Sequence, residues 1–72
     1  MNLKQMEYFV AAAEQLNFTR AAKKCFISQT AMTLQIQSLE EKIGVPLFVR
    51  DKHHVELTAA GKVYLNEARA IL

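Results

Sequence analysis

The sequence predicts a mainly α-helical fold, with three short helices, a two-stranded β-hairpin and a fourth helix. Two observations predict it. Apolar residues recur at helical spacing in four segments, and between the third and fourth segments the period changes to two on either side of a polar turn. The chain has 72 residues, of which 51% are hydrophobic and 22% charged, so we expect one packed domain of marginal stability.

The first two helices follow from apolar spacing. Residues of the first recur three and four positions apart: Leu3, Met6, Phe9, Val10 and Ala13. Asn2 is available as its N-cap, and Asn17 lies near its end. We expect the second helix to run from Arg20 to Phe26, with Thr19 as its N-cap. Its apolar side is expected to consist of Ala21, Ala22, Cys25 and Phe26.

The third helix has clear start and stop signals. The Ser28 hydroxyl can accept a hydrogen bond from the first turn, which begins at Gln29. The helix is expected to run to Ile43, because Gly44 suits a left-handed end and Pro46 prevents continuation. Its expected core stripe is Met32, Ile36, Leu39 and Ile43. With a turn of two or three residues before it, this helix completes a helix-turn-helix unit.

A β-hairpin and a fourth helix complete the predicted fold. From Leu47 the period changes to two, and the segments 47–50 and 55–58 flank the polar segment 51–54, which indicates a hairpin. Thr58 is expected to cap a helix that begins near Ala59. The apolar stripe of that helix continues to the end of the chain: Tyr64, Leu65, Ala68, Ile71 and Leu72.

Charge is unevenly distributed, although the net charge is only +2. No acidic residue lies between Gln15 and Leu39, whereas Arg20, Lys23 and Lys24 all do. A polyanion would therefore meet this part of the chain first.

Other classes of protein fit the sequence poorly. No apolar run approaches the roughly 18 residues of a membrane span, and the first residues do not resemble a signal peptide, so we expect a cytoplasmic protein. The single cysteine, Cys25, cannot form an internal disulfide, and a packing role is expected for it.

The outward face of the third helix is the first candidate site. Thr30, Thr33, Leu34, Gln37 and Glu41 share this face, with Gln29 and Ser38 at its sides. Amides and hydroxyls can read base edges in the major groove, and Leu34 could contact a thymine methyl group. The helix N-terminus, with Ser28, suits a phosphate. The alternative is an ordinary solvated face with one exposed leucine.

The hairpin turn is the second candidate site. Its basic and imidazole side chains are expected to cluster at the tip: Arg50, Lys52, His53 and His54. Such a wing could reach phosphates or the minor groove beside the third helix. The alternative is a solvated turn.

Several fixed spacings together point to a known family. The segments that carry the resemblance are Leu3 with Tyr8-Phe9-Val10, Phe18-Thr19-Arg20-Ala21-Ala22, Ser28-Gln29 through Gln35-Ile36 to Leu39-Glu40, Gly44-Val45-Pro46-Leu47-Phe48 with Arg50, and Leu57-Thr58-Ala59-Ala60-Gly61. Over the whole chain, the sequence resembles the N-terminal DNA-binding domain of LysR-type transcriptional regulators, together with the start of their linker helix.

The resemblance implies a winged helix-turn-helix domain over residues 1–58 and the start of a linker or dimerisation helix over residues 59–72. It implies a double-stranded DNA partner and assembly into dimers or tetramers through the helix from Ala59 onward. It also implies a C-terminal effector domain outside these 72 residues, where any small-molecule effector would bind. The expected DNA-binding residues are Thr19, Arg20, Ser28, Gln29, Thr30, Thr33, Leu34, Gln37, Arg50, Lys52 and His53.

Three positions depart from the family pattern. The family usually has proline at Thr30, serine at Thr33 and very often arginine at Leu34. Thr33 keeps the hydroxyl group. Leu34, together with Gln37 at another position that is often basic, removes cationic contacts, so weaker and more salt-tolerant DNA binding by this module is expected.

Two other functions remain as alternatives. One is a protein-interaction or dimerisation domain that uses the fourth helix without binding DNA. The other is a metal hydrolase that uses His53 and His54, but no Cys, Asp or Glu set supplies the remaining ligands at a known spacing. A glycine-rich phosphate loop and a nucleophile motif are also lacking. The sequence therefore predicts a protein that is not an enzyme and that needs no cofactor or metal in this chain.

Overall fold

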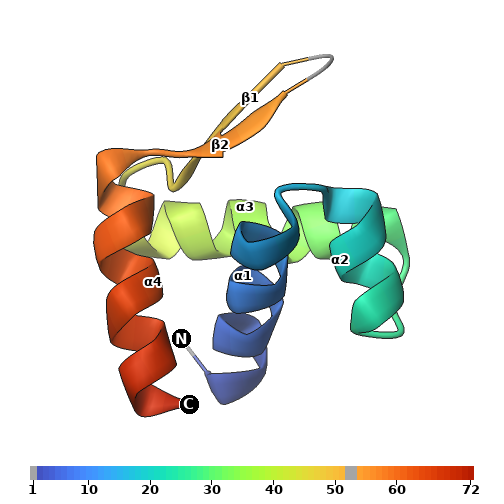
Figure 1. Ribbon diagram of the computed structural model, residues 1–72, viewed down its shortest axis with the longest axis horizontal. Coiled ribbons are helices and arrows are strands. Elements are labelled where there is room, and N and C mark those ends of the chain that lie inside the picture. Colours follow the sequence, from blue (N-terminus) through green and yellow to red (C-terminus); the bar gives the residue numbers. More distant parts are fainter. Residues whose placement is uncertain (1, 52–53) are drawn as a thin grey trace.

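The computed structural model describes residues 2–51 and 54–72. Its elements in chain order are α1 (Leu3–Gln15), α2 (Phe18–Lys24), α3 (Gln29–Ile43), β1 (Phe48–Arg50), β2 (Val55–Leu57) and α4 (Ala59–Ile71). The α1 helix packs against the three other helices, α3 crosses it, and the hairpin projects beyond them (Figure 1). The predicted mainly α-helical fold with a hairpin wing is confirmed.

Aromatic rings join the helices to the hairpin. Phe48 at the start of β1 contacts Phe9 of α1, with ring centroids 5.4 Å apart, and Phe18 of α2, at 5.3 Å. Phe9 in turn meets Tyr64 of α4 edge to face at 4.8 Å. The largest fully buried side chains are Phe9, Met32, Ile36, Leu39 and Leu47. Because Phe48 is buried among these rings, the base of the hairpin is part of the core.

The three predicted N-caps outside α2 are confirmed. The Asn2 side chain accepts from the Gln5 amide at 2.7 Å, the Ser28 hydroxyl from the Ala31 amide at 3.0 Å, and the Thr58 hydroxyl from the Gly61 amide at 3.0 Å. Gly44 ends α3 with φ of 89°, the left-handed conformation expected for it.

The start of α2 differs from the prediction. Asn17, and not Thr19, is the N-cap, and its side-chain oxygen accepts from the Arg20 amide at 2.9 Å. The cause is Phe18, which occupies the first helical position and buries its ring against Phe48. Thr19 therefore lies inside the first turn of α2.

The end of α2 also differs. The helix stops at Lys24, and the turn spans the four residues 25–28 rather than two or three. Phe26, predicted to lie on the apolar side, is left-handed with φ of 60° and is 95% exposed. The Phe26 amide donates to the Lys23 carbonyl and the Ile27 amide to the Ala22 carbonyl. This pair of bonds is a Schellman motif, which turns Phe26 outward and returns Ile27 to the core.

Smaller differences occur at the ends of other elements. Ile43 is exposed, because the buried stripe of α3 ends one turn earlier, at Leu39. Leu3, Ile71 and Leu72 are exposed as well, although each belongs to a predicted apolar stripe.

Cys25 is partly buried and packs against the core, as predicted. This burial raises the pKa of the Cys25 thiol above its usual value.

The hairpin strands are shorter than the predicted segments 47–50 and 55–58. β1 and β2 have three residues each and pair antiparallel, with Phe48 opposite Leu57 and Arg50 opposite Val55. The Thr58 amide donates to the Leu47 carbonyl at 3.0 Å, and the Thr58 hydroxyl donates to the Pro46 carbonyl at 2.8 Å. These bonds join the base of the hairpin to the start of α4.

Across residues 2–51 and 54–72, no helix combines the length and the apolar character that a bilayer crossing requires.

Candidate nucleic-acid interface

The outward face of α3 lies as the sequence predicts. Gln29, Thr30, Leu34 and Gln37 are exposed and Thr33 is half-buried, and all five line one shallow hollow of about 280 Å³. Leu34 is 58% exposed, so this face presents one apolar side chain among four polar ones. We call these five residues the α3 face. Their side chains offer amide and hydroxyl groups, which can both donate and accept hydrogen bonds.

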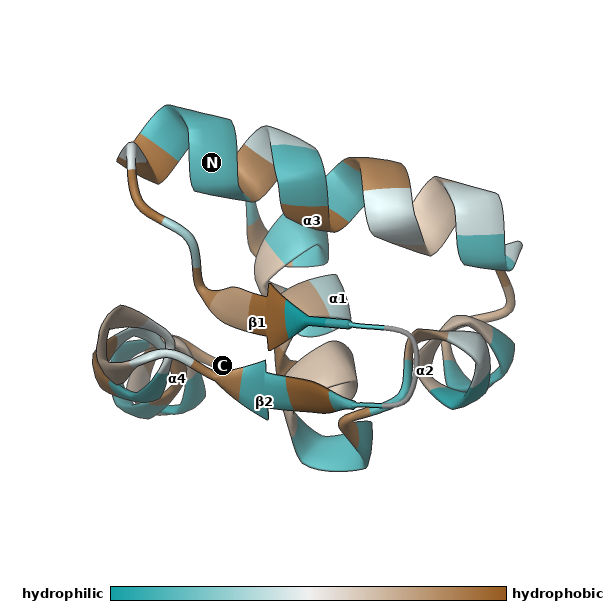
Figure 2. Ribbon diagram, turned by 90° about the horizontal axis from the view of Figure 1, so that it is seen from above, coloured by the Kyte–Doolittle hydropathy of each residue, from teal (hydrophilic) through white to brown (hydrophobic). Residues whose placement is uncertain are grey.

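A second hollow, of about 390 Å³, joins α2, α3 and the hairpin. Four of the predicted site residues line it: Thr19, Gln29, Thr33 and Arg50. The Thr19 hydroxyl donates to the Gln29 side-chain oxygen at 2.9 Å, which connects the start of α2 to the start of α3. Seen from above, β1 runs beside α3 toward the side where α2 lies, and β2 runs back from that side toward α4 (Figure 2). The fold therefore brings α2, the α3 face and the hairpin together on one side.

The charges of α2 are available to a ligand. Arg20, Lys23 and Lys24 are all exposed, and within the described parts of the chain none of them forms an ion pair. Arg20 follows directly after Thr19, near the start of α3, whereas Lys23 and Lys24 lie in the last turn of α2. Ser28 is exposed at the N-terminus of α3, where its hydroxyl already accepts the capping bond.

Arg50 is not at the tip of the hairpin, in contrast to the prediction. It ends β1, and its side chain is only 31% exposed. The guanidinium group lies 4.9 Å from the Phe18 ring centroid, and its Nη2 lies 3.4 Å from the Glu40 Oε1. These contacts turn Arg50 back toward α2 and α3. Lys52 and His53, also predicted at the tip, lie outside the described residues.

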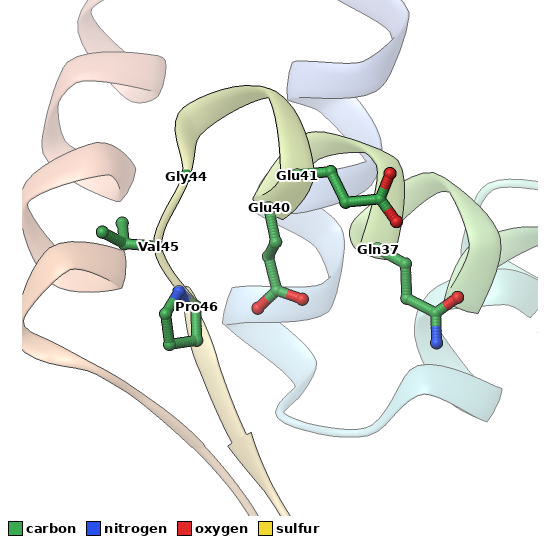
Figure 3. A pocket seen from close by; sticks show the side chains of 6 residues that line it. All are labelled: Gln37, Glu40, Glu41, Gly44, Val45 and Pro46. Atoms are coloured by element: carbon green, nitrogen blue, oxygen red, sulfur yellow. The ribbon is translucent and has the colours of Figure 1, made fainter.

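Glu40 is a site residue that the sequence analysis missed. Its carboxylate, 14% exposed, accepts from the Leu47 amide at 2.7 Å and from the Phe48 amide at 3.2 Å. The Glu40 side chain points toward the segment that leads into β1, whereas Glu41 points away from it, as Figure 3 shows. A signal was present, because Glu40 lies four residues after the core residue Ile36 and hence beside the apolar stripe. An acid in that position requires partners.

His54 makes a local pair in the hairpin. Its Nε2 lies 3.0 Å from the Glu56 Oε1, and both side chains are well exposed. This hydrogen bond, strengthened by the negative charge of Glu56, raises the pKa of His54 above its usual value of 6.5.

The described residues offer no alternative metal centre. Among residues 2–51 and 54–72, no three His, Cys, Asp or Glu side chains come close enough together to hold a metal ion. His54, one of the two histidines considered for such a site, is paired with Glu56 instead.

A comparison with protein families identifies this arrangement. Residues 3–62 match the model of the bacterial regulatory helix-turn-helix proteins of the LysR family. The chain belongs to the LysR family. The resemblance noted in the sequence is thereby confirmed.

Members of the LysR family that resemble this chain are transcriptional regulators. The Hca operon transcriptional activator HcaR of Escherichia coli K12 is 56% identical over 72 residues, which are 100% of this chain and 24% of HcaR. The regulator TfdT of Cupriavidus pinatubonensis is 53% identical over the same residues, which are 32% of TfdT. This chain thus spans about a quarter of the length of HcaR and about a third of that of TfdT.

Solved LysR-family structures show the same fold. The DNA complex of the CbnR DNA-binding domain has a TM-score of 0.94 and 45% identity, and the match covers 99% of this chain and 82% of that one. The complex of the BenM DNA-binding domain with benA site 1 DNA has a TM-score of 0.93 and 38% identity, over 99% of this chain and 80% of that one. The winged helix-turn-helix architecture is therefore that of the LysR family.

Proposed function

We propose that this chain is the sequence-specific, double-stranded DNA-binding domain of a bacterial LysR-type transcriptional regulator that acts in the cytoplasm. The observation that carries the proposal is the α3 face, whose uncharged side chains are exposed except for half-buried Thr33, and whose Gln29 and Thr33 share a hollow with the hairpin. The DNA complexes of the CbnR and BenM domains, which have the same fold, support it.

In this proposal α3 lies in the major groove. Gln29 and Gln37 have the amide groups that pair with an adenine edge, and the hydroxyls of Thr30 and Thr33 can serve several bases. Leu34, exposed in the middle of the α3 face, would contact the methyl group of a thymine. Direct readout would thus depend on hydrogen bonds and one apolar contact, without a cation from this face.

Phosphate contacts would surround this surface. Ser28 and the N-terminus of α3 suit one phosphate, and Arg20 at the start of α2 suits another, which Thr19 would also contact if its hydroxyl exchanged the bond to Gln29 for one to the phosphate. The wing would contact the backbone or the minor groove through Arg50, together with Lys52 and His53. The side chains of α2 and the wing would therefore set the position of α3 in the groove.

We further propose that residues 1–58 form the DNA-binding unit and that α4 begins a linker helix that pairs with a second copy in a dimer or tetramer. Val63, Ile71 and Leu72 of α4 are each more than half exposed, which supports an apolar contact of this kind. Response to a small-molecule effector would belong to a domain outside these 72 residues.

Fluorescence anisotropy with labelled duplex DNA at several salt concentrations tests the proposal. We expect binding that weakens steadily as salt rises, because each neutralised phosphate releases counterions. Absence of binding at about 50 mM salt, or binding that salt does not weaken, would contradict it. A pure interaction domain that used only α4 would give one of those two results.

Sequence readout is tested separately with Thr33→Ala. The preferred site is found by selection from random duplexes. If the Thr33 hydroxyl reads a base, the change should reduce the binding free energy for that site by about 1–3 kcal/mol and alter binding to unrelated DNA little. An equal loss on both kinds of DNA would show that Thr33 contributes only to general affinity.

A further inference from the structure

Glu40 presents an electrostatic conflict. It places a negative charge on α3, the helix proposed to enter the major groove, and simple repulsion from phosphates would make it unfavourable for DNA binding. Yet its carboxylate is largely buried and accepts from two backbone amides and the Arg50 guanidinium, at 2.7, 3.2 and 3.4 Å. The negative charge of Glu40 is therefore balanced by hydrogen-bond donors of the domain itself.

The two amides explain why an acceptor is needed here. Leu47 and Phe48 are both buried, and their amides lie at the junction between the loop after α3 and β1. A carboxylate has only acceptor atoms, so one Glu40 oxygen can accept from both amides while the other accepts from Arg50. Glu40 thereby ties the base of the hairpin directly to α3.

Arg50 is held from two sides by this arrangement. Its guanidinium group lies over the Phe18 ring and against Glu40, which restricts the orientation of a long side chain. A guanidinium group has five N–H donors, and the bond to Glu40 uses Nη2. Arg50 also lines the hollow shared with Thr19, Gln29 and Thr33, so its remaining donors border the proposed DNA surface.

We propose that Glu40 is a positioning residue for DNA binding. It holds the wing against α3 and orients Arg50 toward a phosphate, so that this acidic residue increases the affinity for DNA. The inference rests on the proposed function, because it requires that duplex DNA occupies the surface that Arg50 borders. Glu40 and Arg50 would thus act together in one phosphate contact, which Arg50 makes and Glu40 orients.

The test compares Glu40→Gln with Glu41→Gln. Both changes remove one negative charge from adjacent positions of α3, but Glu41 is exposed and points away from the hairpin (Figure 3). We expect Glu41→Gln to bind duplex DNA as tightly as the unchanged chain or slightly more tightly, since only repulsion is lost. Glu40→Gln should bind about tenfold more weakly at 0.1 M salt, with a salt slope lower by about one, as for the loss of one phosphate contact.

The variants Arg50→Ala and Glu40→Gln/Arg50→Ala complete a double-mutant cycle. If Glu40 acts through Arg50, the double variant should bind no more weakly than Arg50→Ala alone. Fully additive losses, or a Glu40→Gln affinity and salt slope equal to those of Glu41→Gln, would overturn the inference.

Circular dichroism accompanies each titration. Should Glu40→Gln fail to fold, Arg50→Lys in the otherwise unchanged chain decides the matter, because it keeps the charge but lacks the planar fork that lies over Phe18. We expect it to bind more weakly than the unchanged chain, although more tightly than Arg50→Ala because the charge remains, and binding equal to that of the unchanged chain would overturn the inference. If the unchanged chain itself does not bind duplex DNA, the proposed function fails instead, so the two failures are distinguishable.

Discussion

Gly61 allows α4 to start against the base of the hairpin, and replacing it with alanine should destabilise the domain. A Cβ atom at Gly61 would overlap the Leu47 carbonyl oxygen and lie 3.0 Å from the Leu57 Cδ2. The oxygen belongs to the backbone and accepts from the Thr58 amide at 3.0 Å. It cannot move aside without disturbing the junction between the hairpin and α4.

Two opposing effects determine the size of the change. Helix propensity alone favours alanine over glycine by about 1 kcal/mol within a helix. Overpacking against atoms that cannot rotate away costs about 3 kcal/mol, and weakening the bond between Thr58 and Leu47 adds about 1 kcal/mol. The net loss in free energy of unfolding should be about 3 kcal/mol, a large part of the roughly 4–11 kcal/mol expected for a domain of this size.

Urea denaturation followed by circular dichroism measures this loss, and Gly44→Ala is the matched control. Gly44 has φ of 89° and nothing within 4 Å of an added Cβ, so its replacement should cost only about 1–2 kcal/mol of backbone strain. We expect the order of stability to be the unchanged chain, then Gly44→Ala, then Gly61→Ala. A Gly61→Ala protein as stable as the unchanged chain would refute the argument from steric overlap.

Three further predictions concern caps, strain and pH. Asn17→Ala should lower the free energy of unfolding by about 1 kcal/mol, measured by urea denaturation, and Thr19→Ala should lower it less, because Asn17 is the cap. Phe26→Asn should raise the melting temperature, because asparagine tolerates the left-handed conformation better than phenylalanine and the exposed ring loses no packing; an unchanged or lower value would contradict this. Since the pKa of His54 is raised in the folded chain, its pairing with Glu56 should stabilise the hairpin below about pH 6.5 and cease to do so as the pH rises through the raised pKa. An NMR titration of the His54 ring should give a midpoint above 6.5 that Glu56→Gln lowers, and equal midpoints would exclude the pair.

Most of the fold could be predicted from the sequence. Helical spacing together with caps such as Ser28 and Thr58 predicted α1, α3 and α4 closely, because these signals act within one or two turns of the chain. The wheel of α3 likewise predicted that Leu34 and Gln37 are exposed, although it wrongly assigned Ile43 to the core. Much of the candidate site was therefore predictable, since it lies on one regular helix.

The two errors at the ends of α2 occurred where two signals competed. Asn17 and Thr19 are both good caps two residues apart, and the burial of Phe18 against Phe48, 30 positions away, selects Asn17. The apolar pattern placed Phe26 on the buried side of α2, but the Schellman motif turns it outward. A tertiary contact thus selects the N-cap of α2, whereas backbone hydrogen bonds at the helix end determine the orientation of Phe26.

The sequence by itself determined which segments are helical, where three of the four helices begin, where α3 stops and that Leu34 and Gln37 face outward. Only the tertiary structure decided that Glu40 holds the base of the wing, that Arg50 lies over Phe18 instead of at the hairpin tip, and that Gly61 must lack a side chain. The physical reason is the range of the forces involved. Periodicity and capping depend on neighbours within a few residues, whereas these three features depend on atoms that meet only after α2, α3, the hairpin and α4 have packed together.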